Sequence, residues 1–140
     1  MNKEELAEVK SRFAADRYAV ETTGIQILDA GDGLAEVMLE LDNRHKNALG
    51  AVMGAVYFTM ADFAFAVATN SCPQDKTATV TLNSQINYLN AAKSNTLYAK
   101  AVVKKNGRTT VYCEIEIYEK ANDTKRTVAV VSTTGFKISK

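Results

Sequence analysis

The chain has 140 residues, of which 46% are hydrophobic and 24% are charged, so its composition excludes a disordered protein. Seventeen Lys and Arg against sixteen Asp and Glu give a formal net charge of +1, which argues against binding to nucleic acid or to an anionic membrane surface. A chain of this length favours one domain with a sizeable core.

The cysteines and the histidine restrict the chemistry further. Cys72 and Cys113 do not have the spacing of a metal site or a redox motif. His45 is the only histidine, which argues against a zinc site and against a Ser-His-Asp triad. Because the N-terminus carries no signal peptide, we expect a reduced, cytoplasmic setting.

The first part of the chain predicts one helix and two strands. Leu6, Val9 and Phe13 recur at helical spacing and predict an amphipathic helix over residues 3–17. A short strand over residues 25–28, a turn at residues 31–33 and an alternating, half-buried strand over residues 34–41 follow.

A long apolar segment comes next. Residues 48–68 contain a single charged side chain, Asp62, and are long enough to cross a bilayer. A carboxylate at the centre of such a span would be costly in hydrocarbon, and the loops show no charge asymmetry that would orient it. We therefore predict a helix in a water-soluble protein, ending near Asn70 and apolar on nearly all sides because protein surrounds it.

The second half predicts four strands. Lys105-Asn106-Gly107 is typical of a two-residue hairpin, and residues 121–125 form a second polar turn. Six strands joined mostly by hairpins form an antiparallel sheet, which places the protein in the α+β class. One helix can be so apolar only if the sheet wraps around it and self-association covers the rest. The strands are expected over residues 79–88, 97–103, 111–117 and 126–137.

The start of the apolar segment carries a recognisable motif. Residues 45–55, HKNALGAVMGA, with Asp62 eight residues after Gly54, resemble the hotdog-fold acyl-CoA thioesterases of the phenylacetate-degradation (PaaI-like) branch. That branch has roughly N-x-x-G-x-x-H-G-G, then seven residues, then Asp. The resemblance spans about residues 20–138 and implies an N-terminal helix over residues 1–19 followed by one hotdog domain over residues 20–140. Further matches are residues 79–83, 86–89, 106–108 and 128–134.

The resemblance implies hydrolysis of an acyl-CoA thioester and a role for four residues. The Gly54 N–H would polarise the thioester carbonyl, and Asn47 would hold or orient the water or the carbonyl. Asp62 would be the general base or the nucleophile, and Thr81 matches a Ser or Thr that helps to place the water or the carboxylate. No separate cofactor is expected, because coenzyme A is part of the substrate.

Each of these residues also has a purely structural interpretation. Asp62 could cap a neighbouring backbone, Gly50 and Gly54 could permit close packing, and Asn47 could be the N-cap of the helix. Three basic residues, namely Lys93, Lys105 and Arg108, could contact the phosphates of coenzyme A or could simply be solvated.

One departure from the family pattern concerns activity. Met53 stands where the family has His, so a side-chain donor near the carbonyl is missing while the backbone donor remains. Tyr57 and Phe58 follow and would shape the acyl pocket, or pack in the core. Two alternatives to hydrolysis therefore stay open: an acyl-CoA-binding or dehydratase-like protein, and a structural oligomer. The helix lacks the His that dehydratases of this fold usually carry.

The spacing within the helix predicts the assembly. Gly54 and Asp62 lie about 12 Å apart along a helix axis, so one helix cannot bring both to the same reacting group. Two antiparallel helices can, with Gly54 of one chain facing Asp62 of the other, which predicts an obligate homodimer with two sites. The resemblance implies the same arrangement, often as a dimer of dimers.

Overall fold

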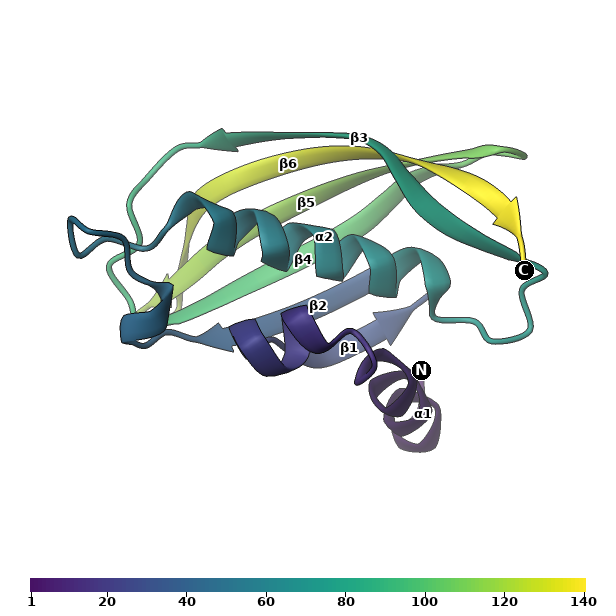
Figure 1. The fold of residues 1–140 in the computed structure, drawn as a ribbon, viewed down its shortest axis with the longest axis horizontal. Helices are drawn as coiled ribbons and strands as arrows, with labels where there is room; N and C mark the ends of the chain where they lie inside the picture. Colours follow the sequence, from purple (N-terminus) through teal and green to yellow (C-terminus); the bar gives the residue numbers. More distant parts are fainter.

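A six-stranded antiparallel sheet curls around one central helix in the computed structural model, which describes residues 1–140 (Figure 1). The strand order is β1-β2-β4-β5-β6-β3. This arrangement confirms the predicted α+β hotdog architecture. The strands are β1 (Gln26–Gly31), β2 (Leu34–Glu40), β3 (Thr77–Tyr88), β4 (Thr96–Asn106), β5 (Thr110–Ala121) and β6 (Thr124–Ser139).

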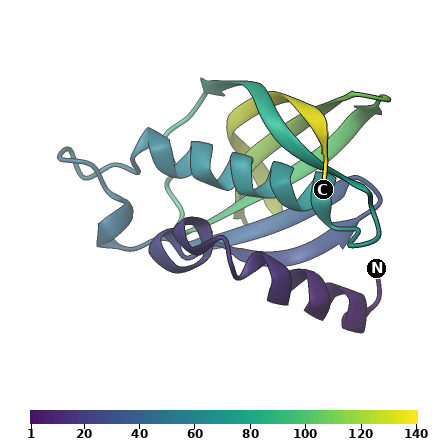
Figure 2. The same ribbon diagram turned by 45° about the vertical axis from the view of Figure 1, so that its right-hand side comes forward.

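The N-terminal helix α1 (Lys3–Phe13) ends four residues earlier than the sequence predicts. Its start is fixed by a reciprocal capping box between Asn2 and Glu5. Val9 is buried in the main core and Phe13 packs against that core, but the positions one turn further along that face, Asp16 and Arg17, are charged. No apolar side chain therefore continues the helix packing beyond Phe13. A turn of π-helix (Tyr18–Thr23) follows and contacts the central helix, while α1 contacts β1 (Figure 2).

The central helix α2 (Gly54–Asn70) ends where predicted and is buried by the sheet on most sides. Nine of its seventeen residues are buried, Phe65 and Met60 among the deepest. None of the helices is long and apolar enough to cross a membrane. One stripe of α2 stays uncovered by the sheet: Ala55 and Asp62 are exposed and the others are partly exposed, and the residues recur at intervals of three or four along the helix. They are Ala55, Phe58, Thr59, Asp62, Ala66 and Thr69.

Two turns define the hairpins of the sheet. The β4–β5 loop has three residues, Gly107–Thr109, rather than the two that the sequence predicts. The β5–β6 turn consists of Asn122 and Asp123, both with positive φ (50° and 65°), as a tight primed hairpin turn requires.

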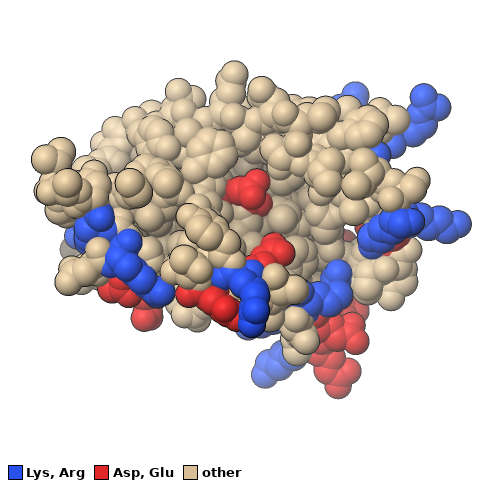
Figure 3. Space-filling view, viewed as in Figure 1, with Lys and Arg blue, Asp and Glu red and all other residues tan.

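Strand β3 is an edge of the sheet and presents unusual apolar surface. A register shift between Thr81 and Asn83 interrupts its alternation, and Val80 and Leu82 remain 41% and 61% exposed. The other edge of β3 has no strand partner in the chain. Figure 3 shows mostly uncharged side chains over α2 and β3, with Lys and Arg nearer the rim of that face. Such an edge is suited to pairing with another strand.

Candidate active site

The loop before α2 is shaped by Asn47. Its Oδ1 accepts hydrogen bonds from the N–H groups of Leu49 (3.0 Å) and Ala51 (3.1 Å). Gly50 lies in this turn with φ +80° and open space beside it, so a turn rather than close packing accounts for this glycine. The N-cap of α2 is Met53, whose side chain makes no capping bond, so the alternative that Asn47 caps the helix is wrong.

The same loop is fastened from behind by His45, a buried residue only 3% exposed. Its Nδ1 accepts the Asp42 N–H at 2.9 Å, so Nε2 carries the proton and donates to the Thr23 carbonyl at 2.7 Å. The backbone carbonyl of His45 also accepts the Met53 N–H at 2.9 Å. The histidine therefore connects the π-helical turn to the residue that precedes α2.

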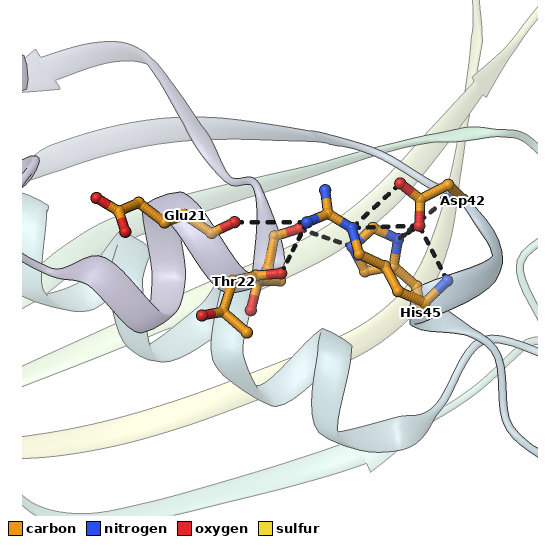
Figure 4. A network of polar contacts seen from close by, with 6 residues as sticks. Glu21, Thr22, Asp42 and His45 are labelled. Atoms are coloured by element: carbon orange, nitrogen blue, oxygen red, sulfur yellow. Dashed lines mark hydrogen bonds and ion pairs between the residues drawn. The ribbon is translucent and has the colours of Figure 1, made fainter.

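A neighbouring arginine reinforces this attachment. Arg44 donates to the Thr22 carbonyl at 3.0 Å and pairs with the Asp42 carboxylate at 3.1 Å. Figure 4 shows Glu21 and Thr22 of the π-helical turn on one side of this network and Asp42 and His45 on the other. The Arg44 N–H bond helps to hold the pKa of Asp42 below its ordinary value. The loop that leads into α2 is thus anchored to the π-helical turn, which lies 22 residues earlier in the sequence.

Two backbone donors at the start of α2 are unpaired. The N–H groups of Gly54 and Ala55 donate to no acceptor in the chain, whereas the Val56 N–H donates to the Met53 carbonyl at 2.9 Å. Unpaired N–H groups in a first helical turn, together with the helix dipole, favour a negatively charged oxygen beside them. Met53 lies next to them and is half exposed.

A cavity of about 380 Å³ adjoins Gly54. Tyr57 is buried on one side of it, and its ring lies 6.0 Å from that of Tyr88. Phe58 does not line this cavity and lies instead on the uncovered stripe of α2. The lining residues are Ala51, Val52, Gly54, Tyr57, Tyr88, Asn90, Ala91 and Ala92.

Tyr88, the last residue of β3, explains why residue 54 is a glycine. Its hydroxyl donates to the Gly54 carbonyl at 3.1 Å. A Cβ atom at residue 54 would lie 3.1 Å from that Oη and 3.2 Å from Cζ, which is tighter than ordinary contact. The glycine therefore permits the close approach of a tyrosine ring.

The far wall of the cavity is the loop over residues 89–95, which a buried carboxylate holds. Glu119 accepts the N–H groups of Lys93 and Ser94, each at 2.8 Å, and pairs with Arg126 at 2.7 Å. Arg126 also donates to the Ala91 carbonyl at 2.9 Å. Burial raises the pKa of Glu119, but the two N–H donors and Arg126 outweigh burial and leave this pKa below its ordinary value.

Asp62 lines a different cavity, of about 290 Å³, between α2 and the π-helical turn. The Thr81 hydroxyl donates to Asp62 Oδ1 at 3.4 Å, and no Lys or Arg pairs with the carboxylate. Burial raises the pKa of Asp62, while the Thr81 bond opposes the rise. Asp62 accepts no backbone N–H, so the alternative that it caps a neighbouring backbone is wrong.

The structure divides the predicted site residues into groups. Gly54, Met53 and Tyr57 lie together, and Lys93 lies in the loop beside them. Asp62 and Thr81 form the second group. The hairpin that carries Lys105 and Arg108 lies at the end of the sheet opposite the start of α2 (Figure 1).

Comparison with known proteins identifies the family. Residues 49–134 match the thioesterase superfamily, a range that includes Gly54, Asp62 and Thr81. The chain belongs to this superfamily. The resemblance that the loop motif indicates is therefore confirmed.

Solved structures of similar fold include proteins of the same class. The E. coli PaaI protein from the phenylacetic acid degradation operon is 26% identical with a TM-score of 0.82, over 97% of this chain and 95% of that chain. A hypothetical thioesterase protein of Streptococcus pneumoniae, whose structure contains coenzyme A, is 25% identical with a TM-score of 0.77, over 91% and 98%. A conserved protein of Pseudomonas aeruginosa is 28% identical with a TM-score of 0.76, over 85% and 92%.

Proposed function

We propose that the protein hydrolyses acyl-CoA thioesters to a free acid and coenzyme A. The observation that carries this proposal is the pair of unpaired N–H groups at the start of α2, beside an apolar cavity. A thioester carbonyl placed there gains a hydrogen bond from the Gly54 N–H, which strengthens as negative charge develops on the oxygen. Membership of the thioesterase superfamily supports the same chemistry.

Asp62 supplies the second half of the reaction. As a general base it takes a proton from water, the water oxygen bonds to the thioester carbon, and the C–S bond breaks with the proton passing to the sulfur. As a nucleophile its carboxylate bonds to that carbon, the C–S bond breaks to release the thiolate, and a mixed anhydride forms. Water then hydrolyses the anhydride to the free acid and the Asp62 carboxylate, and the thiolate takes up a proton from solvent. Thr81 holds the carboxylate in either case, and Asn47 acts by shaping the loop that presents Gly54.

The working unit is a homodimer with α2 helices antiparallel, so that Gly54 of one chain faces Asp62 of the other. Apart from Phe58 and Asp62, the residues of the uncovered α2 stripe are small and uncharged, which allows two helices to approach, and the free edge of β3 can pair with its copy. Two such homodimers could further associate into a tetramer, a dimer of dimers. Lys93 is a proposed contact of the coenzyme A phosphates. Lys105 and Arg108 lie at the opposite end of the sheet, so they can serve the same coenzyme A only from the partner chain of the antiparallel dimer. A cytoplasmic location remains a prediction.

Met53 favours one alternative, an acyl-CoA-binding protein that turns over slowly. Its side chain is 51% exposed at the start of α2, where the family His would offer a donor. A thioether donates no hydrogen bond, so the carbonyl depends on backbone donors alone.

Release of free thiol from a panel of acyl-CoAs tests the proposal. We expect turnover of at least one ester by the wild type, loss of turnover in Asp62→Asn, and unchanged turnover in the control Asp75→Asn, in an exposed loop. Tight binding of acyl-CoA without thiol release would favour the alternative. If the protein neither binds acyl-CoA nor releases thiol, both the proposed hydrolysis and the acyl-CoA-binding alternative are contradicted.

A further inference from the structure

The Tyr88 hydroxyl contacts the first peptide group of α2. It donates to the Gly54 carbonyl at 3.1 Å. That carbonyl shares one rigid, planar peptide unit with the N–H of Ala55. A donor that holds the carbonyl oxygen therefore also sets the direction of the Ala55 N–H.

The Ala55 N–H is available for a ligand. It donates to no acceptor in the chain, and Ala55 itself is exposed on the uncovered stripe of α2. Together with the Gly54 N–H it forms two consecutive donors in the first turn of the helix. Hydrogen bonds in a chain polarise one another, so donation into the Gly54 carbonyl makes the Ala55 N–H a stronger donor.

The packing of the Tyr88 side chain does not require its hydroxyl group. Its side chain is 53% exposed and does not belong to the core. Its ring leans against Tyr57 with the ring centroids 6.0 Å apart, a contact that phenylalanine would make equally well. The hydroxyl has one hydrogen-bond partner in the structure, the Gly54 carbonyl.

We propose that Ala55 supplies a second N–H to the thioester oxygen, and that Tyr88 is a positioning residue that orients and polarises this donor. The hydrogen bonds run from the Tyr88 hydroxyl to the Gly54 carbonyl, and from the Ala55 N–H to the oxygen of the reacting group. No bond is made or broken at Tyr88. This inference rests on the proposed function, because it needs a carbonyl at the start of α2.

Tyr88→Phe removes the hydroxyl and keeps the ring. We expect kcat to fall about tenfold, less than for complete loss of an oxyanion donor, with KM within about twofold of wild type. The Tm should be unchanged, because the hydroxyl is at the surface. The Ala55 amide proton should shift upfield in the ¹H–¹⁵N spectrum. Tyr112→Phe, a partly exposed tyrosine on β5 with no side-chain hydrogen bond, is the matched control and should change none of these values.

Each outcome decides the inference. An active wild type with unchanged kcat in Tyr88→Phe would overturn it and leave the proposed function standing. A variant in which Tm, kcat and KM all change, with the Ala55 amide unmoved, would show a merely structural tyrosine and would also overturn it. A wild type that releases no thiol from any acyl-CoA would overturn the proposed function, and this inference with it.

Discussion

Gly54 and Asp62 lie on the same helix, eight residues apart, yet they line two different cavities of the protein. Gly54 adjoins Tyr57 and Tyr88 at the start of α2. Asp62, near the middle of α2, adjoins the π-helical turn. The separation of about 12 Å along the axis is too large for one reacting group.

Asp62→Asn should abolish thiol release and also stabilise the protein at neutral pH. Partial burial beside the π-helical turn raises the pKa of Asp62 above its ordinary value of 3.8, so between the two pKa values the folded chain holds a proton that the unfolded chain has already lost. Stability that depends on Asp62 therefore falls as the pH rises through this window. Thermal unfolding should show a higher Tm for Asp62→Asn at neutral pH and no difference in acid. A lower Tm at neutral pH would contradict a desolvated carboxylate.

Thr81→Val should move the pH profile of the reaction to higher pH. The Thr81 hydroxyl stabilises the ionised form of Asp62, so its loss raises the pKa of Asp62 further. Because the reaction needs the carboxylate, the acid limb of kcat/KM against pH should shift upward. Valine keeps the β-branched shape, and Thr81→Ser, which keeps the hydroxyl, should leave the limb near its wild-type position. Identical profiles in the three proteins would exclude this role of Thr81.

Met53→His should raise turnover of at least one acyl-CoA by about tenfold or more, since a positioned donor on the carbonyl oxygen has an effect of that order or larger. Met53→Leu, which adds no donor, serves as the control and should not gain. The comparison uses kcat measured by thiol release. If no substrate is turned over faster by Met53→His, the pocket has adapted to methionine.

Glu119→Gln should destabilise the protein by about 1–3 kcal/mol and raise KM, because one carboxylate holds the Lys93 and Ser94 N–H groups and Arg126. The lowered pKa of Glu119 means that its contribution is complete above its ordinary pKa of 4.5 and is lost as the pH falls through the folded-state value. The difference in Tm between wild type and variant should therefore shrink in acid. Glu114→Gln, on the exposed face of β5, is the control.

Sequence patterns predict the fold because they report which faces are buried. The alternation over residues 34–40 and 111–117 matches the buried faces of β2 and β5, and the apolar run around Asp62 marks the helix that the sheet encloses. In β3 and β5 the alternation fails where the register shifts, after Thr81 and after Ile117. At the second shift Tyr118 is buried out of phase, while Glu119 stays on the buried face of Ile115 and Ile117. Alternation therefore marks residue 119 as buried, but the partners of its carboxylate, the Lys93 and Ser94 N–H groups and Arg126, come from other segments.

The site is only partly predictable for a related reason. The family motif identifies Gly54 and Asp62 as candidate site residues. The residues that contact them come from segments distant in sequence, which the motif does not include. His45 looks like a loop residue until the carbonyl of Thr23 is placed beside it. Tyr88 looks like an ordinary strand residue until the start of α2 lies against its hydroxyl. The glycine at residue 54 is the one local signal that something approaches closely there.

Gly54→Pro is the partner variant for a direct test of the shared site. Proline removes the N–H at the first helical position, where it is otherwise well tolerated. Met53 already has the extended backbone, φ −65° and ψ 137°, that a residue before proline prefers. The proline Cβ requires Tyr88 to give way by a few tenths of an ångström, which its half-exposed side chain can do.

The most direct measurement is thiol release by a co-refolded mixture of Asp62→Asn and Gly54→Pro chains, each inactive alone. A mixed dimer combines an intact Gly54 from one chain with an intact Asp62 from the other at one of its two sites. With random pairing, half of the dimers are mixed, so the account predicts about a quarter of the wild-type activity. If both parent proteins fold and dimerise but every mixture remains inactive, the site is not shared between chains.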